Sequence, residues 1–131
     1  MDNINNVNRN EHEKSNDCGT SYIPYADLKE VMEKSEKGKM SYTLLDEKNG
    51  CTAGCKTGVT FYDGTEYGRG GIHKDQEGFF VIAGHGMARI GDAEFAVYPG
   101  ISFIAPAGVH HTVKRDADSE AVAVFWFHSA V

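Results

Sequence analysis

Apolar residues occur in short runs that are separated by turns along most of the chain. Runs of strand length, rich in β-branched and aromatic side chains, stand at 40–46, 58–64, 78–84, 87–91, 94–99, 101–106, 110–115 and 121–128. Gly-Asp, Pro-Gly, Pro-Ala-Gly and Asp-Ala-Asp-Ser separate several of these runs, and such residues favour turns. Short strands at regular spacing are typical of a sandwich or a barrel, so the pattern predicts an all-β fold.

One segment near the start of the chain has helical rather than strand spacing. Asp27 suits an N-cap, Leu28 and Val31 recur at helical spacing, and Gly38 suits a C-cap. The pattern therefore predicts a short amphipathic helix at about 27–37.

The composition divides the chain into a tail and one domain. Residues 1–20 are rich in Asn, Asp, Glu and Lys and hold few apolar side chains, so they cannot offset the entropy cost of being ordered. We expect a disordered tail at 1–20 and a single domain at 21–131, with its core barrel at about 58–128. A chain of 131 residues can bury one core, and a second domain is not expected.

Charge and hydropathy argue against two classes of partner. The chain has 19 acidic and 13 basic residues, a formal net charge of -6, and no cluster of Lys and Arg that would bind nucleic acid or anionic lipid. No apolar run approaches the ~20 residues that span a bilayer, and the N-terminus lacks the basic start and apolar core of a signal peptide. We therefore expect a cytoplasmic protein whose partner is a small molecule.

The cysteines are three in number, Cys18, Cys51 and Cys55, and nothing in the sequence indicates an oxidising compartment. Cys51 and Cys55 have a spacing that would suit half of a zinc site, but a second cysteine pair is absent. We interpret them as two reduced thiols near a turn.

Potential metal ligands gather between Arg69 and Arg115, a stretch that contains four of the six histidines of the chain. His73 and Glu77 are four residues apart, but the surrounding glycines do not favour a helix. In one continuous strand the two side chains would lie ~13 Å apart, too far to bind one ion. A turn at 74–76 would instead place His73 at the end of one strand and Glu77 at the start of the next.

His111 completes a candidate metal site. It follows a Pro-Ala-Gly turn, which can aim a side chain into a barrel as the strand begins. Two imidazoles and one carboxylate are a common ligand set for a first-row transition metal and leave coordination positions for water or substrate. His73, Glu77 and His111 are therefore the predicted ligands of an iron, zinc, manganese or nickel ion. The alternative is a relic pocket in which the same side chains are hydrogen bonded without an ion.

Two further residues are candidates for a catalytic role. His128 ends the last strand on the same face as Trp126, where it would serve as a fourth ligand, as a general base or as a packing residue at the barrel mouth. Arg69 would bind a substrate carboxylate or phosphate, or else it is a solvated charge at a strand end. His110 and His85 are expected at the surface.

Two stretches of the sequence resemble the motifs of the cupin superfamily. The first motif, two histidines separated by one residue and followed by a glutamate and a glycine, is resembled at Gly71, Ile72, His73, Glu77 and Gly84. The second motif is resembled at Gly100, Pro106, Gly108 and His111. The sequence between them, VIAGHGMARIGDAEFAVYPG, is similar to the hairpin that is typical of the family. The resemblance covers roughly residues 58–128, and two motifs with correct internal spacing are jointly fairly specific.

The resemblance implies a small single-domain β-barrel of the RmlC-like jelly-roll type, with His73, Glu77 and His111 as metal ligands. Gly71 stands where the family pattern has its first histidine, so at most three of the usual four ligands are present. The implied function is a metal-dependent enzyme, of the oxygenase, isomerase or decarboxylase type, that acts on a small polar molecule in the barrel. The alternative is a non-catalytic module that binds a sugar or an organic acid.

Oligomeric state is predicted from strands that are apolar on both faces. Residues 79–82 and 121–127 have no polar face, and one short helix cannot cover both segments outside the barrel. We therefore expect a homodimer.

Overall fold

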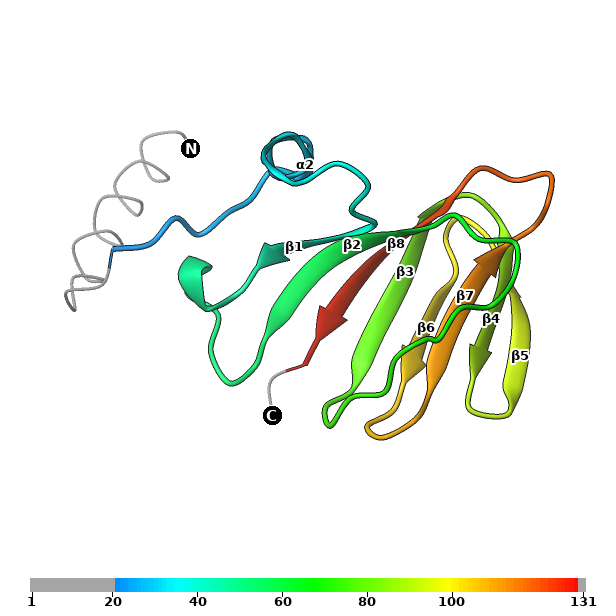
Figure 1. Ribbon diagram of the computed structural model, residues 1–131. Helices are drawn as coiled ribbons and strands as arrows, with labels where there is room; N and C mark the ends of the chain where they lie inside the picture. The colour runs from blue at the N-terminus through cyan, green and yellow to red at the C-terminus, as the bar shows by residue number, and fades with distance from the viewer. Residues whose placement is uncertain (1–20, 130–131) are drawn as a thin grey trace, which may run out of the picture.

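The computed structural model describes residues 21–129 and shows two antiparallel β-sheets that face each other (Figure 1). In chain order the elements are the α-helix α2 (Leu28–Lys34), the strand β1 (Ser41–Leu45), the 3-10 helix η1 (Glu47–Asn49), and the strands β2 (Lys56–Tyr62), β3 (Glu77–Ala83), β4 (Gly86–Ile90), β5 (Ala93–Val97), β6 (Ser102–Ala105), β7 (His111–Arg115) and β8 (Val122–His128). All eight predicted strands are present, and the all-β prediction is confirmed. The tail predicted at 1–20, which contains Cys18, lies outside the described residues.

The larger sheet has five strands in the order β1-β2-β8-β3-β6, and the smaller sheet has three in the order β5-β4-β7. The last strand, β8, therefore lies between β2 and β3 in the middle of the larger sheet. An isolated antiparallel bridge between Gly71 and His111 connects the long β2–β3 loop to the smaller sheet. These non-local pairings produce the jelly-roll barrel that the sequence resemblance implies.

The core fills the space between the two sheets and follows the alternation of side chains along each strand. On β3, Phe79 and Val81 are buried while Phe80 and Ile82 are exposed on the outer face. The buried cluster comprises Phe79, Val81, Ala88, Val97, Ala105, Val113, Val122, Val124 and Trp126. Burial of this apolar surface provides the main stabilisation of the barrel.

The helix begins as predicted but ends earlier than the predicted residue 37. The side chain of Asp27 accepts a hydrogen bond from the backbone N–H of Glu30 at 3.0 Å, as an N-cap does. Ser35 takes an extended backbone and closes the helix, because its hydroxyl donates to the carbonyl of Val31 at 2.7 Å. Gly38, predicted as the C-cap, lies beyond the helix with a φ of 84°. No helix among the described residues is long and apolar enough to cross a membrane.

Gly86 lies where β4 passes closest to β7. A Cβ added at this position would meet the backbone carbonyl oxygen of Lys114 and would lie 2.8 Å from the Cα of Arg115. Both atoms belong to the backbone of the neighbouring strand, so they cannot rotate away as a side chain would. The close packing of β4 on β7 therefore requires glycine at position 86.

We expect Gly86→Ala to lower the free energy of unfolding by about 1–3 kcal/mol, because the added methyl forces the two strands of the smaller sheet apart. Gly68→Ala is the matched control, since nothing lies within 4 Å of its added Cβ, and it should change the free energy by no more than about 0.5 kcal/mol. Urea denaturation of both variants measures the difference. Equal stability of the two variants would contradict the close approach of β4 and β7.

Candidate metal centre

The three predicted ligands converge at one end of the barrel. Glu77 is the first residue of β3 and His111 the first residue of β7, while His73 lies in the loop that precedes β3. The Nε2 atoms of His73 and His111 each lie 3.2 Å from Oε1 of Glu77. One ligand atom from each of the three residues lies within 4.8 Å of the other two. This spacing allows all three side chains to reach a single ion.

The local chain path differs in one respect from the predicted one. A bend at Lys74 and Asp75 precedes Glu77, as expected, but His73 stands in a loop rather than at the end of a strand. Only Gly71 pairs with the smaller sheet, through two hydrogen bonds of 2.9 Å with the backbone of His111. The carbonyl of His73 is instead held by the backbone N–H of Gly108 at 2.7 Å. The β2–β3 loop therefore places His73 by hydrogen bonds to the turn before β7.

The Glu77 carboxylate is buried and only 6% exposed. Its Oε1 atom has no hydrogen-bond partner, and Nδ1 of His111 also lacks one. A buried carboxylate oxygen without a donor is costly unless a positive charge compensates it. Burial and the negative charge of Glu77 also raise the pKa of Tyr62 to about 12. The chemistry of these donors and the unpartnered Oε1 fit a divalent cation between the two imidazoles.

Gly71 approaches the same atoms with its backbone. A Cβ at this position would lie 3.1 Å from Nε2 of His111 and 3.3 Å from Nε2 of His73. Contacts of this length are tight for a carbon atom, so a side chain here would push one of the two imidazoles aside. The residue that replaces the expected histidine is therefore also the one that leaves room for the two remaining histidines.

The site opens into a hollow of about 400 Å³ with a mixed lining. Besides the three candidate ligands and Gly71, the lining residues include Ser41, Thr60, Tyr62, Thr112, Trp126 and His128. Hydroxyl groups and aromatic rings thus share the wall. Such a hollow suits a small polar molecule.

His128 lines this hollow together with Trp126, on the face that the two residues share. Its Nε2 lies 3.6 Å from Oε2 of Glu77, and its Nδ1 lies 2.9 Å from Oδ2 of Asp75. The sequence indicated Asp75 only as a turn residue. Its pairing with His128 spans 53 positions of the chain, and no local pattern signals such a contact.

Arg69 and His110 lie on the outside of the β2–β3 loop and of the turn before β7. Both are exposed, and Nε2 of His110 is 2.7 Å from the carbonyl oxygen of Arg69. The exposed position of His110 agrees with the prediction. Arg69 does not line the hollow, and its catalytic role stays a prediction.

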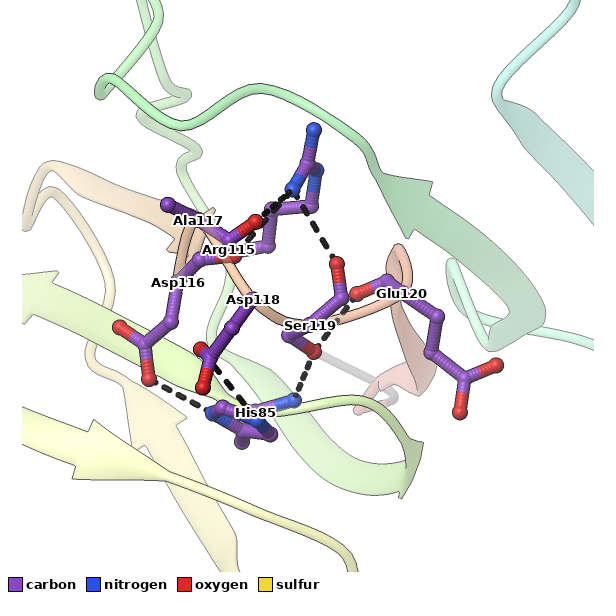
Figure 2. A network of polar contacts seen from close by, with 7 residues as sticks. All are labelled: His85, Arg115, Asp116, Ala117, Asp118, Ser119 and Glu120. Carbon is purple, nitrogen blue, oxygen red and sulfur yellow. Dashed lines mark hydrogen bonds and ion pairs between the residues drawn. The ribbon is translucent and has the colours of Figure 1, made fainter.

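His85 forms a second polar cluster at the other end of the barrel (Figure 2). Its Nδ1 lies 2.7 Å from Oδ2 of Asp116, its Nε2 lies 3.8 Å from Oδ1 of Asp118, and its backbone N–H donates to the Ser119 hydroxyl at 2.8 Å. The two carboxylates approach opposite nitrogens of one exposed imidazole. One ligand atom from each of His85, Asp116 and Asp118 also lies within 4.8 Å of the other two, but these side chains are 44% to 84% exposed, and exposed acidic groups are common without an ion. The contacts hold the β7–β8 turn against the start of β4. Arg115 stabilises the same turn by donating to the carbonyls of Asp116, Ala117 and Ser119.

Cys51 and Cys55 are free thiols that are partly buried beside one another after η1. Burial and the neighbouring Cys55 thiol raise the pKa of Cys51. The two groups of three or more potential metal ligands within residues 21–129 contain neither cysteine. Both thiols are free in the structure, and their interpretation as ordinary thiols stays a prediction.

Solved structures with the same fold share little sequence with this chain. The cupin domain of Cnp3 from Schizosaccharomyces pombe has a TM-score of 0.59 and 15% identity, over 72% of this chain and 66% of that chain. An RmlC-like cupin family protein with a double-stranded β-helix fold, from Methanocaldococcus jannaschii, has a TM-score of 0.57 and 13% identity, over 74% and 84% of the two chains. The Fe(II) form of HppE has a TM-score of 0.55 and 15% identity, over 68% of this chain and 48% of that chain.

At these identities the likeness establishes the fold alone. This chain spans slightly less than two thirds of the Cnp3 chain and about half of the HppE chain. No curated protein matches the sequence. The profile of the cupin domain matches residues 59–128, more than half of the chain, and the protein therefore belongs to the cupin domain family.

Proposed function

We propose that this cupin domain binds a divalent transition metal ion through His73, Glu77 and His111 and acts as a metal-dependent enzyme on a small polar molecule in the hollow. The observation that carries the proposal is the buried Oε1 of Glu77, which has two imidazole nitrogens at 3.2 Å and no hydrogen-bond donor. A cation would relieve this arrangement, whereas in a relic pocket only a charged imidazole would compensate the carboxylate.

The donor set suits iron, zinc, nickel or manganese, because imidazole and carboxylate ligands together favour first-row transition ions. The Fe(II) form of HppE, which shares the fold, is one example of a protein with iron. When bound, such an ion supplies Lewis-acid activation of a carbonyl or, in the case of iron, redox chemistry with dioxygen. The identity of the metal is left to measurement.

The lining of the hollow supports binding of a polar substrate. The hydroxyls of Ser41 and Thr60 lie 2.8 Å apart, and Thr60 also accepts a hydrogen bond from the Trp126 indole at 2.9 Å. Tyr62 has a pKa of about 12, because burial and the charge of Glu77 both disfavour its anion. It therefore stays protonated at neutral pH and offers a hydrogen-bond donor to substrate rather than a base.

A homodimer is the second part of the proposal. Apolar side chains on β3, β6 and β8 are 42% to 49% exposed on the outer face of the larger sheet, namely Phe80, Ile82, Ile104 and Phe127. Ile104 and Phe127 flank Gly78 on its two sides, so these side chains form one patch, while helix α2 packs near β1 at the edge of the sheet. A patch of this kind on a soluble protein marks an interaction surface. The cytoplasmic location stays a prediction from sequence.

We expect protein purified without chelator to contain about one equivalent of transition metal by mass spectrometry. Glu77→Gln and His73→Ala should each lower metal affinity by more than about 100-fold. Loss of a residue that only contacts a ligand costs about 10- to 100-fold, and loss of a ligand itself should cost more. His85→Ala, which removes an imidazole at the other end of the barrel, should retain wild-type affinity. Metal at well below one equivalent that reconstitution does not restore would refute the metal site.

Thermal unfolding separates the enzyme from the non-catalytic binding module. Saturating metal at about 100 times its dissociation constant should stabilise the wild type by about 2.7 kcal/mol and leave Glu77→Gln unchanged. Sugars, keto acids and amino acids are then screened for further stabilisation and for turnover. Turnover that disappears with the metal supports the enzyme, whereas ligand stabilisation that survives metal removal supports the binding module.

We expect light scattering to give the mass of a dimer at micromolar concentration. Phe80→Glu should shift the protein towards the monomer, because a charge would then lie in the centre of the apolar patch. Tyr98→Glu is the matched control, since Tyr98 is an aromatic residue on the β5–β6 connection that is 53% exposed, against 46% for Phe80. A wild-type monomer, or equal dissociation of both variants, would rule out this interface.

A further inference from the structure

His128 faces Glu77 from the neighbouring strand of the larger sheet. The two residues are direct partners in the antiparallel pairing of β3 and β8, so their side chains lie on the same inner face. The ring of His73 lies 5.0 Å from the ring of His111 and 5.2 Å from the ring of His128, measured between centroids. His73 thus has two imidazole neighbours at nearly the same distance, one on each of two strands.

The carboxylate of Glu77 connects these imidazoles through its two oxygens. Oε1 lies 3.2 Å from Nε2 of His73 and of His111, and Oε2 lies 3.6 Å from Nε2 of His128. His128 remains outside the group whose ligand atoms are all within 4.8 Å of one another. It therefore borders the side of Glu77 that the other two histidines leave open.

Asp75 determines which nitrogen of His128 faces the site. Its Oδ2 lies 2.9 Å from Nδ1 of His128. At this distance the Asp75 carboxylate can accept the Nδ1 proton of a neutral His128 ring, in which Nε2 then presents a lone pair. Metal-binding histidines typically have this carboxylate partner.

The lone pair on Nε2 of His128 then faces another acceptor, Oε2 of Glu77, across 3.6 Å. Two acceptors turned towards each other in a partly buried site repel unless a cation lies near both of them. The Trp126 ring packs edge-on against His128 at 5.4 Å, which restricts rotation of the imidazole away from the site. The arrangement therefore suits a cation better than it suits a hydrogen bond.

Position 71 is a glycine and offers no imidazole, and a side chain added there would crowd the other two histidines. A Cβ on Gly71 would already lie 3.1 Å from Nε2 of His111 and 3.3 Å from Nε2 of His73. Both nitrogens belong to side chains, so a side chain at position 71 would need the two imidazoles to move aside. A fourth imidazole has to come from another element.

We propose that His128, oriented by Asp75, is a fourth protein ligand of the metal centre and takes the place of the imidazole that position 71 lacks. The inference rests on the proposed function, since it requires metal binding by His73, Glu77 and His111. Three imidazoles and one carboxylate favour zinc, iron, cobalt or nickel over magnesium and calcium. The three nitrogen ligands would come from the β2–β3 loop, from β7 and from β8.

The test is a titration of the metal-free protein with Co²⁺, whose visible absorption reports its coordination. Affinity comes from competition with a chromophoric chelator. His128→Gln should bind Co²⁺ at least about 10-fold more weakly and with a changed visible spectrum, and Asp75→Asn should lose about 10- to 100-fold in affinity. His85→Gln is the matched control, because it removes the other aspartate-paired histidine of the domain, and it should match the wild type in both readouts.

The outcomes separate this inference from the proposed function. A wild type that binds neither Co²⁺ nor Zn²⁺ defeats both. Binding that Glu77→Gln abolishes but that His128→Gln leaves unchanged in affinity and spectrum overturns only the role of His128. Thermal unfolding without metal shows whether each variant is folded. If His128→Gln does not fold, Asp75→Asn decides the matter, since wild-type affinity and spectrum in that variant would overturn the inference.

Discussion

A carboxylate buried at the end of an apolar core is the constraint on which the site depends. Glu77 begins β3, a central strand flanked by β6 and β8, so its side chain cannot turn to solvent without breaking the alternation that buries Phe79 and Val81. Desolvation of an unpaired carboxylate costs several kcal/mol, roughly as much as a small domain has to spare. The surrounding imidazoles are His73 from a loop, His111 from β7 and His128 from β8. All three lie within 3.6 Å of the Glu77 carboxylate.

The strand β8 connects the apolar core to the candidate metal centre. Val122 and Val124 on β8 belong to the fully buried core, and the same strand continues to Trp126 and then to His128 at the polar site. Since β8 runs antiparallel to β3, its last residue meets the first residue of that strand, and Figure 1 shows the end of β8 beside the start of β3. Apolar packing along β3 and β8 thus holds Glu77 and His128 in place, whereas His73 is positioned by the β2–β3 loop.

Sequence predicted the parts of this arrangement that depend on local pattern. Strand positions follow from alternation and turn residues, and the inward direction of His111 follows from the turn that precedes it. The predicted end of α2 at residue 37 was wrong. The Ser35 hydroxyl donates to the carbonyl of Val31 in place of a backbone N–H, and helix propensity does not indicate such a contact. The pairing of His128 with Asp75 was missed because it depends on the register of β8 against β3, a tertiary property without a local signal.

The absence of a histidine at position 71 of the sequence motif does not mean that the metal centre lacks a fourth ligand. The two backbone hydrogen bonds between Gly71 and His111 draw the β2–β3 loop against β7, and at that distance a side chain would displace the imidazoles it was meant to join. With the loop docked this tightly, a histidine at position 71 would require the imidazoles of His73 and His111 to shift. Gly71 lets the β2–β3 loop pack against β7 at the site. In the proposed arrangement, His128 on β8, the strand beside Glu77, then supplies the imidazole nitrogen that position 71 lacks.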